Sequence, residues 1–447
     1  MQEVRDVVGR PGFRRAASNF GWLAVERVVR FGFGTVVGLL VARHLGPERF
    51  GTLSYCVALV TLAGVVPALG LDALLRRQVV QDPARAADWL LSALVLRAAA
   101  GLLLVLGVLA ASAAGLGLAG EEAGTVAVLA LLLLQPALFT PEPWLHAGLH
   151  GRWVALTQIG ALAIAGVVRL RLIAADARLA AFAWVLVAEM GVTALGFWLA
   201  SRRLGLAWAA GRPTWATGRR LLGEAWPLLC AGLAVAIYMK IDEVMLRHLA
   251  GPGVVGVYAA AVKLSELSYF VPTALAASVL PALLRARGEA AGYARRQQQY
   301  YDLSAALAYG FAVPCALLAP WLVGWAYGER YAGAAPVLAV HAWAAVFVFL
   351  GVARAQWLVN EGLTRFYLAA TCAGAVVNIF LNLLLIPRWG GVGAAWATVA
   401  AQALASWLVS YLHPAVRPTA AMQTRALLLP LRGWTYLRRP ARAEAGP

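Results

Sequence analysis

Residues 50–71 read FGTLSYCVALVTLAGVVPALGL and contain no Asp, Glu, Lys or Arg. Four further stretches of at least 22 residues are equally free of charge: 98–120, 303–328, 366–387 and 389–416. The hydrocarbon core of a bilayer is about 30 Å thick, and a helix needs about 20 residues to cross it. These stretches therefore predict transmembrane helices.

The composition of the whole chain agrees with this interpretation. Of its 447 residues, 62% are hydrophobic and 13% are charged, about half of the roughly 25% charged residues in soluble domains. This excludes a water-soluble enzyme. The four cysteines lie singly inside apolar stretches, so they form neither a disulfide framework nor a CxxC metal site.

Hydropathy predicts an all-α, polytopic membrane protein with about twelve transmembrane helices. We place them roughly at 20–41, 50–71, 89–112, 123–141, 154–174, 179–200, 221–246, 254–283, 302–326, 332–356, 365–386 and 391–412. With the N-terminus in the cytoplasm, the cytoplasmic segments hold 24 Lys and Arg residues and the outer segments hold 6. The positive-inside rule therefore places both termini in the cytoplasm. The net charge of +17 reflects this loop distribution and does not indicate a nucleic-acid partner.

A repeated motif indicates that the membrane part consists of two related halves. Residues 43–51 read RHLGPERFG and residues 247–256 read RHLAGPGVVG, an offset of 204 to 205 positions. An offset of six spans gives both halves the same topology, an arrangement found in transporters. We expect these parts: 1–17 as a cytoplasmic interfacial segment, 18–200 as the N-terminal six-helix lobe, 201–220 as a cytoplasmic linker, 221–413 as the C-terminal six-helix lobe and 414–447 as a basic cytoplasmic tail.

Ionisable residues inside the spans differ between the two halves. The first half has a sum of +3, from Arg27, Arg30, Arg97, Arg169 and Arg171 against Glu26 and Glu189. The second half has a sum of zero, from Lys240, Lys263 and Arg354 against Asp242, Glu243 and Glu266. Charges inside a membrane are costly and often mark a functional site. The excess of arginine favours a wet cavity in the first lobe that accepts an anion.

Guanidinium groups suit phosphate or pyrophosphate because they carry a permanent charge and forked donors. We therefore expect the cations Arg30, Arg97, Arg169, Lys240 and Lys263 to bind substrate. Carboxylates can take up a proton or ligate Na⁺, so we expect ion coupling at Glu26, Asp242, Glu243 and Glu266. The alternative is that neighbouring charges neutralise each other, because the spacings of Glu26 with Arg30, Lys240 with Glu243 and Lys263 with Glu266 allow pairing.

Motifs for catalysis are missing from the sequence. The only lysines, Lys240 and Lys263, lie inside spans, so there is no GxxxxGK[ST] loop, and neither HExxH nor GxSxG occurs. We expect no catalytic residue, no metal site and no cofactor apart from a coupling H⁺ or Na⁺.

Three stretches carry a resemblance to a known family. Residues 45–80 (LGPERFGTLSYCVALVTLAGVVPALGLDALLRRQVV), 238–266 (YMKIDEVMLRHLAGPGVVGVYAAAVKLSE) and 386–399 (IPRWGGVGAAWATV) resemble the Wzx-like oligosaccharide flippases. These form the polysaccharide transporter branch of the multidrug/oligosaccharidyl-lipid/polysaccharide exporter superfamily. The resemblance covers about residues 15–415. Asp242 matches an acidic residue usual in its helix, and the family's cavity cations correspond by span position to Arg30, Arg97 and Arg169.

The resemblance implies a V-shaped, MATE-like pair of six-helix lobes that works by alternating access. It implies a flippase of the bacterial inner membrane that moves undecaprenyl-pyrophosphate-linked oligosaccharide to the periplasmic leaflet. Its partners would be this lipid, the bilayer and other membrane proteins of polysaccharide assembly.

Three alternatives stay open at this point. A drug or metabolite exporter of the same superfamily would favour cationic substrates and an acidic cavity. A membrane glycosyltransferase or polymerase would need carboxylates in a sizeable outer loop, and the outer loops here are short. A scaffold without transport activity would tolerate the loss of every cavity arginine.

Overall fold

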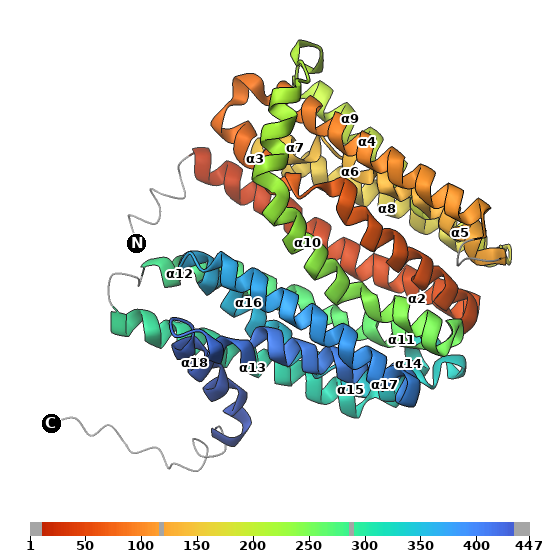
Figure 1. Ribbon diagram of the computed structural model, residues 1–447, viewed down its shortest axis with the longest axis vertical. Helices are drawn as coiled ribbons and strands as arrows, with labels where there is room; N and C mark the ends of the chain where they lie inside the picture. The colour runs from red at the N-terminus through yellow and green to blue at the C-terminus, as the bar shows by residue number, and fades with distance from the viewer. Residues whose placement is uncertain (1–10, 116–119, 286–289, 433–447) are drawn as a thin grey trace. The chain divides into compact units, whose positions relative to one another are not determined.

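The computed structural model describes residues 11–115, 120–285 and 290–432, and within these ranges the chain is almost wholly helical and has no strand (Figure 1). Residues 1–10 of the expected interfacial segment and 433–447 of the expected tail lie outside the described residues. The chain divides into two compact units, 1–247 and 248–447. Each unit is described by itself.

The first unit contains the helices from α2 to α10. Their bounds are α2 (Pro11–Ala68), α3 (Leu71–Gln81), η1 (Pro83–Arg85), α4 (Ala86–Ala113), α5 (Gly120–Leu129), η2 (Ala130–Leu134), α6 (Gln135–Leu138), α7 (Glu142–Ala147), α8 (Gly151–Ala174), α9 (Leu179–Arg203), η3 (Trp208–Ala210) and α10 (Trp215–Ala250), of which α10 belongs to this unit as far as Arg247.

The second unit contains the helices from α11 to α18. Their bounds are α11 (Pro252–Ser265), η4 (Glu266–Tyr269), α12 (Phe270–Arg285), α13 (Ala290–Leu317), α14 (Ala319–Tyr327), η6 (Glu329–Tyr331), α15 (Ala334–His341), α16 (Ala344–Asn360), α17 (Thr364–Ser406), η7 (Leu408–Leu412) and α18 (Arg417–Leu427). Helix α18 lies within the expected tail and packs on α13 through a hydrogen bond from Tyr309 Oη to Leu427 O (2.9 Å).

The number of membrane spans agrees with the sequence. Among the described residues, nine helices are long and apolar enough to cross a bilayer, and α13 with α14, bent by 74°, makes a tenth. Two of the nine are double-length helices, each interrupted by one residue of non-helical backbone: Gly46 in α2 and Gly390 in α17. Division at these two glycines gives the twelve predicted spans, and the prediction of an all-α, polytopic membrane protein is confirmed.

The two copies of the sequence motif have the same backbone conformation. Gly46 has φ 70° and ψ 172°, and Gly251 has φ 89° and ψ 168°. This region of the backbone map is essentially restricted to glycine. A proline follows each glycine, at the first position of the next helical segment, where its missing N–H costs nothing. The two motifs therefore form the same sharp turn between successive spans.

In the first unit, α2 packs along α8, and α8 packs along α9. Small residues allow this close approach, as is usual between membrane helices. A Cβ on Gly166 of α8 would lie 2.3 Å from the Phe33 ring of α2, and a Cβ on Gly196 of α9 would lie 2.3 Å from Thr157 of α8. The backbone N–H of Gly151 also donates to Asn19 Oδ1 of α2 (2.6 Å). These contacts fix the register in which the polar residues of the three helices meet.

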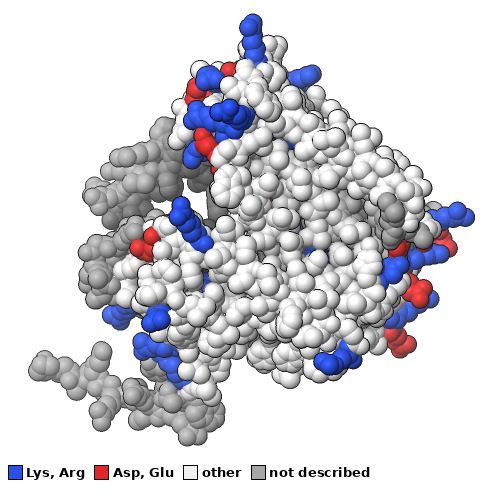
Figure 2. Space-filling view, in the orientation of Figure 1, with Lys and Arg blue, Asp and Glu red and all other residues white. Residues whose placement is uncertain are grey.

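Charged side chains gather near the ends of the helices. Figure 2 shows the middle parts of the helices almost entirely white, with most of the blue and red atoms at the helix ends and loops. This is the distribution expected of a chain that crosses a bilayer many times.

We expect Gly46→Ala and Gly251→Ala each to lower the free energy of unfolding by about 1–3 kcal/mol, because alanine is strained at these φ and ψ values. Thermal unfolding in detergent would measure the effect. The control is Gly107→Ala in α4, where a Cβ meets nothing within 4 Å, and which should leave the melting temperature equal or higher. Equal stability of all three variants would contradict the shared turn.

Candidate functional site

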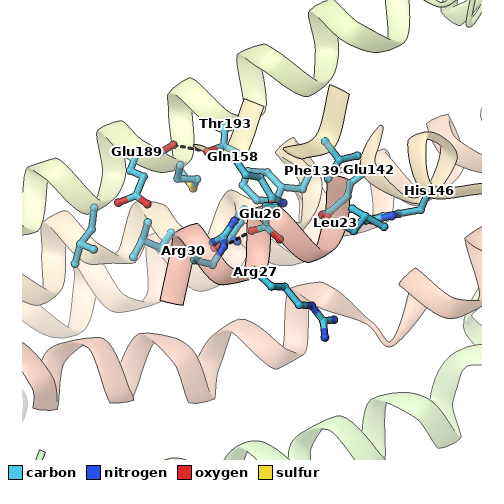
Figure 3. A pocket seen from close by; sticks show the side chains of 15 residues that line it. Leu23, Glu26, Arg27, Arg30, Phe139, Glu142, His146, Gln158, Glu189 and Thr193 are labelled. Atoms are coloured by element: carbon cyan, nitrogen blue, oxygen red, sulfur yellow. Dashed lines mark hydrogen bonds and ion pairs between the residues drawn. The ribbon is translucent and has the colours of Figure 1, made fainter. Parts of the chain in front are cut away.

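The first unit contains a cavity of about 540 Å³, within the range typical of small-molecule sites. Its walls come from α2, α8, α9 and the short segments between α5 and α8 (Figure 3). The lining residues are Leu23, Glu26, Arg27, Arg30, Leu132, Gln135, Phe139, Glu142, His146, Val154, Gln158, Leu186, Glu189, Met190 and Thr193. Five of these carry a carboxylate or a guanidinium, and Gln135, His146, Gln158 and Thr193 add further polar groups.

An ion pair on α2 forms one wall. Arg30 donates from Nε to Glu26 Oε1 (2.5 Å) and from Nη2 to Gln158 Oε1 of α8 (2.6 Å). The i,i+4 spacing predicts this pairing. The Glu26 side chain is only 9% exposed, whereas the Arg30 side chain is 50% exposed. The guanidinium is therefore held in place while much of its surface stays accessible.

A second ion pair joins α8 and α9. Arg169 Nη2 donates to Glu189 Oε2 at 2.7 Å, and both side chains are largely buried. Glu189 lines the cavity and Arg169 does not. Arg169 is partly buried, whereas Arg171, two residues further along α8, is exposed. Arg169 therefore neutralises a carboxylate of the wall.

Arg27 is a cavity residue that the sequence analysis did not select. It lines the cavity and is exposed. Among the described residues, its guanidinium has no hydrogen-bond or ion-pair partner. Figure 3 shows its side chain extending away from the other labelled side chains. The signal in the sequence was its place beside Glu26, deep in an apolar span.

Glu142 and His146 were not among the predicted site residues either, because α7 lies between the predicted spans 123–141 and 154–174. They lie four residues apart on this six-residue helix, and His146 Nε2 is 3.5 Å from Glu142 Oε1. Both line the cavity. A short helix between spans carries no periodic signal, so only the folded chain shows that it forms part of the wall.

The charge of the lining differs from the charge of the helices. The sum over the first six predicted spans is +3, whereas the described lining residues include three glutamates and two arginines. Two of the glutamates are paired with arginines. The remaining groups are the cation Arg27 and the pair Glu142–His146.

Arg97 lies outside the cavity and is 1% exposed. It donates to Asp72 Oδ1 of α3 (2.7 Å), to Ala68 O at the end of α2 (3.3 Å) and to Pro136 O of α6 (3.2 Å). The carbonyl of Ala68 has no later helical N–H to accept from, because α2 ends there. The arginine thus joins three segments and satisfies carbonyls at helix breaks.

The candidate residues of α10 lie close together on one stretch of that helix. Lys240 Nζ donates to Glu243 Oε1 (2.6 Å), the pairing that the i,i+3 spacing allows. Asp242 and Glu243 are buried, with exposures of 4% and 6%. None of the three is among the residues that line the cavity of the first unit.

Lys263 and Glu266 belong to the second unit. Lys263 is in the last turn of α11, and Glu266 begins the 3₁₀ turn η4 that separates α11 from α12. Both are partly buried. The predicted span 254–283 is therefore a broken helix, and two candidate residues lie at its break.

Arg354, one of the ionisable residues inside the predicted spans, belongs to α16 of the second unit. It is 3% exposed and donates to Ser410 Oγ (2.5 Å) and to Ala405 O (2.6 Å). It therefore bonds to neighbouring segments within the unit and does not extend to the surface.

Comparisons with known proteins identify the family and the fold. The sequence model of the family described as "Polysaccharide biosynthesis protein" matches residues 16–287. None of the curated proteins matches the sequence. Among solved structures, the lipid II flippase MurJ in an inward closed conformation superposes with a TM-score of 0.73 at 12% identity, covering 94% of this chain and 93% of that chain.

Two other solved structures have the same fold. A multidrug resistance MATE family transporter of the MOP superfamily, inward-facing, gives a TM-score of 0.64 at 15% identity, with 92% of this chain and 96% of that chain covered. A MOP superfamily transporter from Pyrococcus furiosus, described as having a binding pocket of reverse polarity, gives a TM-score of 0.59 at 14% identity, with 95% of this chain and 98% of that chain covered. The likeness shows a MurJ- and MATE-like fold.

We expect Arg97→Met to destabilise the first unit by about 3 kcal/mol, because it removes the hydrogen bonds that the buried guanidinium donates to Asp72, Ala68 O and Pro136 O. Thermal unfolding of the detergent-solubilised protein measures this. Arg171→Met, at an exposed site on α8, is the control and should melt like the wild type. A normal melting temperature together with weaker anion binding would instead support the substrate-binding role that the sequence predicts for Arg97.

Proposed function

The chain belongs to the polysaccharide biosynthesis protein family, and from this premise we propose that it flips undecaprenyl-pyrophosphate-linked oligosaccharide from the cytoplasmic to the periplasmic leaflet. The family and the fold are those of membrane transporters and flippases. The chain is a multi-pass membrane protein by its apolar helices and by its structural neighbours. The substrate, the direction of transfer and the bacterial inner membrane as location are parts of the proposal.

The observation that carries the proposal is the pair of accessible arginines in the cavity of the first unit. Arg27 has no anionic partner among the described residues, and half of the Arg30 side chain is exposed. Both belong to α2, three residues apart, and both line the cavity, with the Arg27 side chain extending away from Arg30 in Figure 3. Two guanidinium groups in one cavity are suited to a pyrophosphate, which offers several oxygen acceptors.

Transfer by this route needs the headgroup to leave water while the polyprenyl chain stays in the bilayer. The cavity supplies fixed charges and polar groups, such as Gln158 and Gln135, in place of the hydration that the headgroup loses. We propose alternating access as the motion. In this account Arg27 and Arg30 hold the pyrophosphate, Arg169 keeps Glu189 neutralised, and Arg97 holds the lobe together.

An ion gradient across the membrane would set the direction of substrate transfer. The candidates from the sequence remain part of the proposal: Glu26, Asp242, Glu243 and Glu266 as coupling carboxylates, and Lys240 and Lys263 as further cations for the substrate. The coupling ion would be H⁺ or Na⁺, with no other cofactor. The ratio of 24 to 6 basic residues supports cytoplasmic termini, and other membrane proteins of polysaccharide assembly are the expected partners.

A second candidate function is export of a cationic drug or metabolite. The observation that favours it is the presence of Glu26, Glu142 and Glu189 in the lining. Two of these carboxylates are already bonded to arginine, so the anionic character left for a cationic substrate is small. Drug sensitivity of a deletion strain separates the two functions, since only an exporter would protect the cell.

Leaflet transfer in proteoliposomes tests the proposal, with labelled undecaprenyl-pyrophosphate-oligosaccharide as the reporter. We expect Arg27→Ala and Arg30→Ala each to slow transfer roughly 10- to 100-fold, the loss expected when a charge-assisted hydrogen bond of about 1.5–3 kcal/mol is removed. Arg30→Lys should retain part of the rate, because it keeps the charge and loses the fork.

The matched control is Arg171→Ala, which removes an exposed arginine of the same unit outside the cavity. It should transfer at the wild-type rate. Equal rates in the Arg27, Arg30 and Arg171 variants would exclude the cavity as the pyrophosphate site. Absence of transfer by the wild type would contradict the function itself.

A further inference from the structure

The last described helix of the second unit lies outside the part of the chain that the family model matches. That match ends at residue 287, whereas α18 (Arg417–Leu427) begins five residues after Leu412, where the last apolar segment ends. From Arg417 onward the sequence contains six arginines and one glutamate, with no lysine or aspartate. The proposed function does not use this helix, so its role has to follow from its own contacts.

One face of α18 is fixed to the other helices of the second unit. Gln423 is fully buried, and its Nε2 donates to Ser406 O of α17 (3.0 Å) and to Leu350 O of α16 (3.3 Å). From α13, Gln298 Nε2 donates to Met422 O of α18 (3.1 Å). The buried residues of this face are Thr419, Ala420, Gln423 and Ala426. Because three helices hold α18, its opposite face stays on the outside of the unit.

The opposite face of α18 combines exposed arginines with exposed apolar side chains. Spacings of four, four and three residues place its members on one side of the helix, and these are Arg417, Ala421, Arg425 and Leu428. Leu431, just after the helix, is 70% exposed. Arg417 donates from Nε to Tyr411 O (2.8 Å), and among the described residues neither Arg417 nor Arg425 forms an ion pair. Since α18 has no acidic residue, this face is basic and apolar at the same time.

Helix α18 lies where membrane spans of the second unit end. The indole of Trp407, at the end of α17, donates to Thr424 Oγ1 of α18 (2.9 Å), and tryptophan is enriched at the level of the lipid headgroups. In Figure 1, α18 crosses the direction of α13 and α17 instead of following it. Figure 2 shows Lys and Arg atoms on the visible surface at this end of the second unit. This placement brings the exposed face of α18 to the surface of the bilayer.

We propose that the exposed face of α18 binds an anionic phospholipid of the adjacent leaflet. Arg417 and Arg425 bind the headgroup phosphate, for which the forked guanidinium is well suited. Leu428 and Leu431 enter the boundary between headgroups and acyl chains, as apolar side chains of interfacial helices do. A zwitterionic lipid carries its own cation and is attracted less by the two arginines. This inference does not depend on the proposed function.

The consequence is a second unit whose stability follows the lipid composition of that leaflet. Helix α18 is bonded to α13, α16 and α17, so a lipid that holds α18 at the membrane surface also holds the ends of these three helices together. A ligand that binds the folded state alone stabilises that state. Anionic lipid therefore acts on the bundle through a helix that is remote from the cavity of the first unit.

The test is titration of the full-length protein in detergent with phosphatidylglycerol or phosphatidylcholine, with bound lipid counted by native mass spectrometry. We expect Arg417→Gln/Arg425→Gln to bind phosphatidylglycerol about 25-fold more weakly than the wild type, or about fivefold for each arginine near an anionic headgroup. Arg417→Lys/Arg425→Lys should keep most of the affinity, because the charges remain. Phosphatidylglycerol should also raise the melting temperature of the wild type by about 3 °C and leave that of the glutamine variant unchanged.

The matched control is Arg330→Gln/Arg388→Gln, which removes two arginines at other exposed positions of the same unit and should bind phosphatidylglycerol like the wild type. An equal loss in both double glutamine variants would overturn the inference, because the attraction would then be unspecific. Equal affinity of the wild type for the two lipids would overturn it as well. So would a dimer that the α18 variant abolishes, since a second copy would then cover this face. Equal melting temperatures of all proteins without lipid exclude misfolding as the cause.

Discussion

A charge inside the hydrocarbon layer must be paired, bonded to backbone or in contact with water, because lipid offers no hydrogen bonds. This constraint accounts for the arrangement of the first unit. Arg97 meets it by donating to two carbonyls and to Asp72. Arg169 meets it through Glu189. Arg27 has neither kind of partner among the described residues, and it lines the cavity together with the paired Arg30. The same constraint thus distinguishes Arg97 and Arg169, whose charges are partnered within the fold, from Arg27.

The cavity depends on how closely α2, α8 and α9 approach one another. Glycines at the contacts bring the backbones together, and the Asn19–Gly151 hydrogen bond sets the register of α2 against α8. In that register Arg30 reaches both Glu26 and Gln158. Packing therefore determines which side of α2 faces the cavity, and the ion pair then holds one guanidinium at its wall.

Much of the fold could be predicted from the sequence, because each crossing of the bilayer needs a run of about 20 apolar residues, and such runs can be recognised in the sequence. The repeated motif around Gly46 and Gly251 could also be recognised from residue types alone, and the structure adds that the two glycines have similar backbone angles. Within the site, the four-residue spacing of Glu26 and Arg30 was enough to predict their ion pair. The sequence could not predict that Arg97 lies outside the cavity that Arg30 lines, because the position of Arg97 depends on Asp72 and on carbonyls of other helices. The sequence also could not predict that α7 forms part of the cavity wall, because a helix of six residues between spans is too short to show a hydrophobic periodicity.

A structure of the protein with undecaprenyl pyrophosphate bound, determined by cryo-electron microscopy, tests the central claim most directly. The account predicts the pyrophosphate in the cavity of the first unit, with oxygen atoms within hydrogen-bonding distance of Arg27 and Arg30. It also predicts that Arg97 keeps its bonds to Asp72 and the two carbonyls. Pyrophosphate bound elsewhere, with the Arg27 side chain unoccupied, would contradict the account.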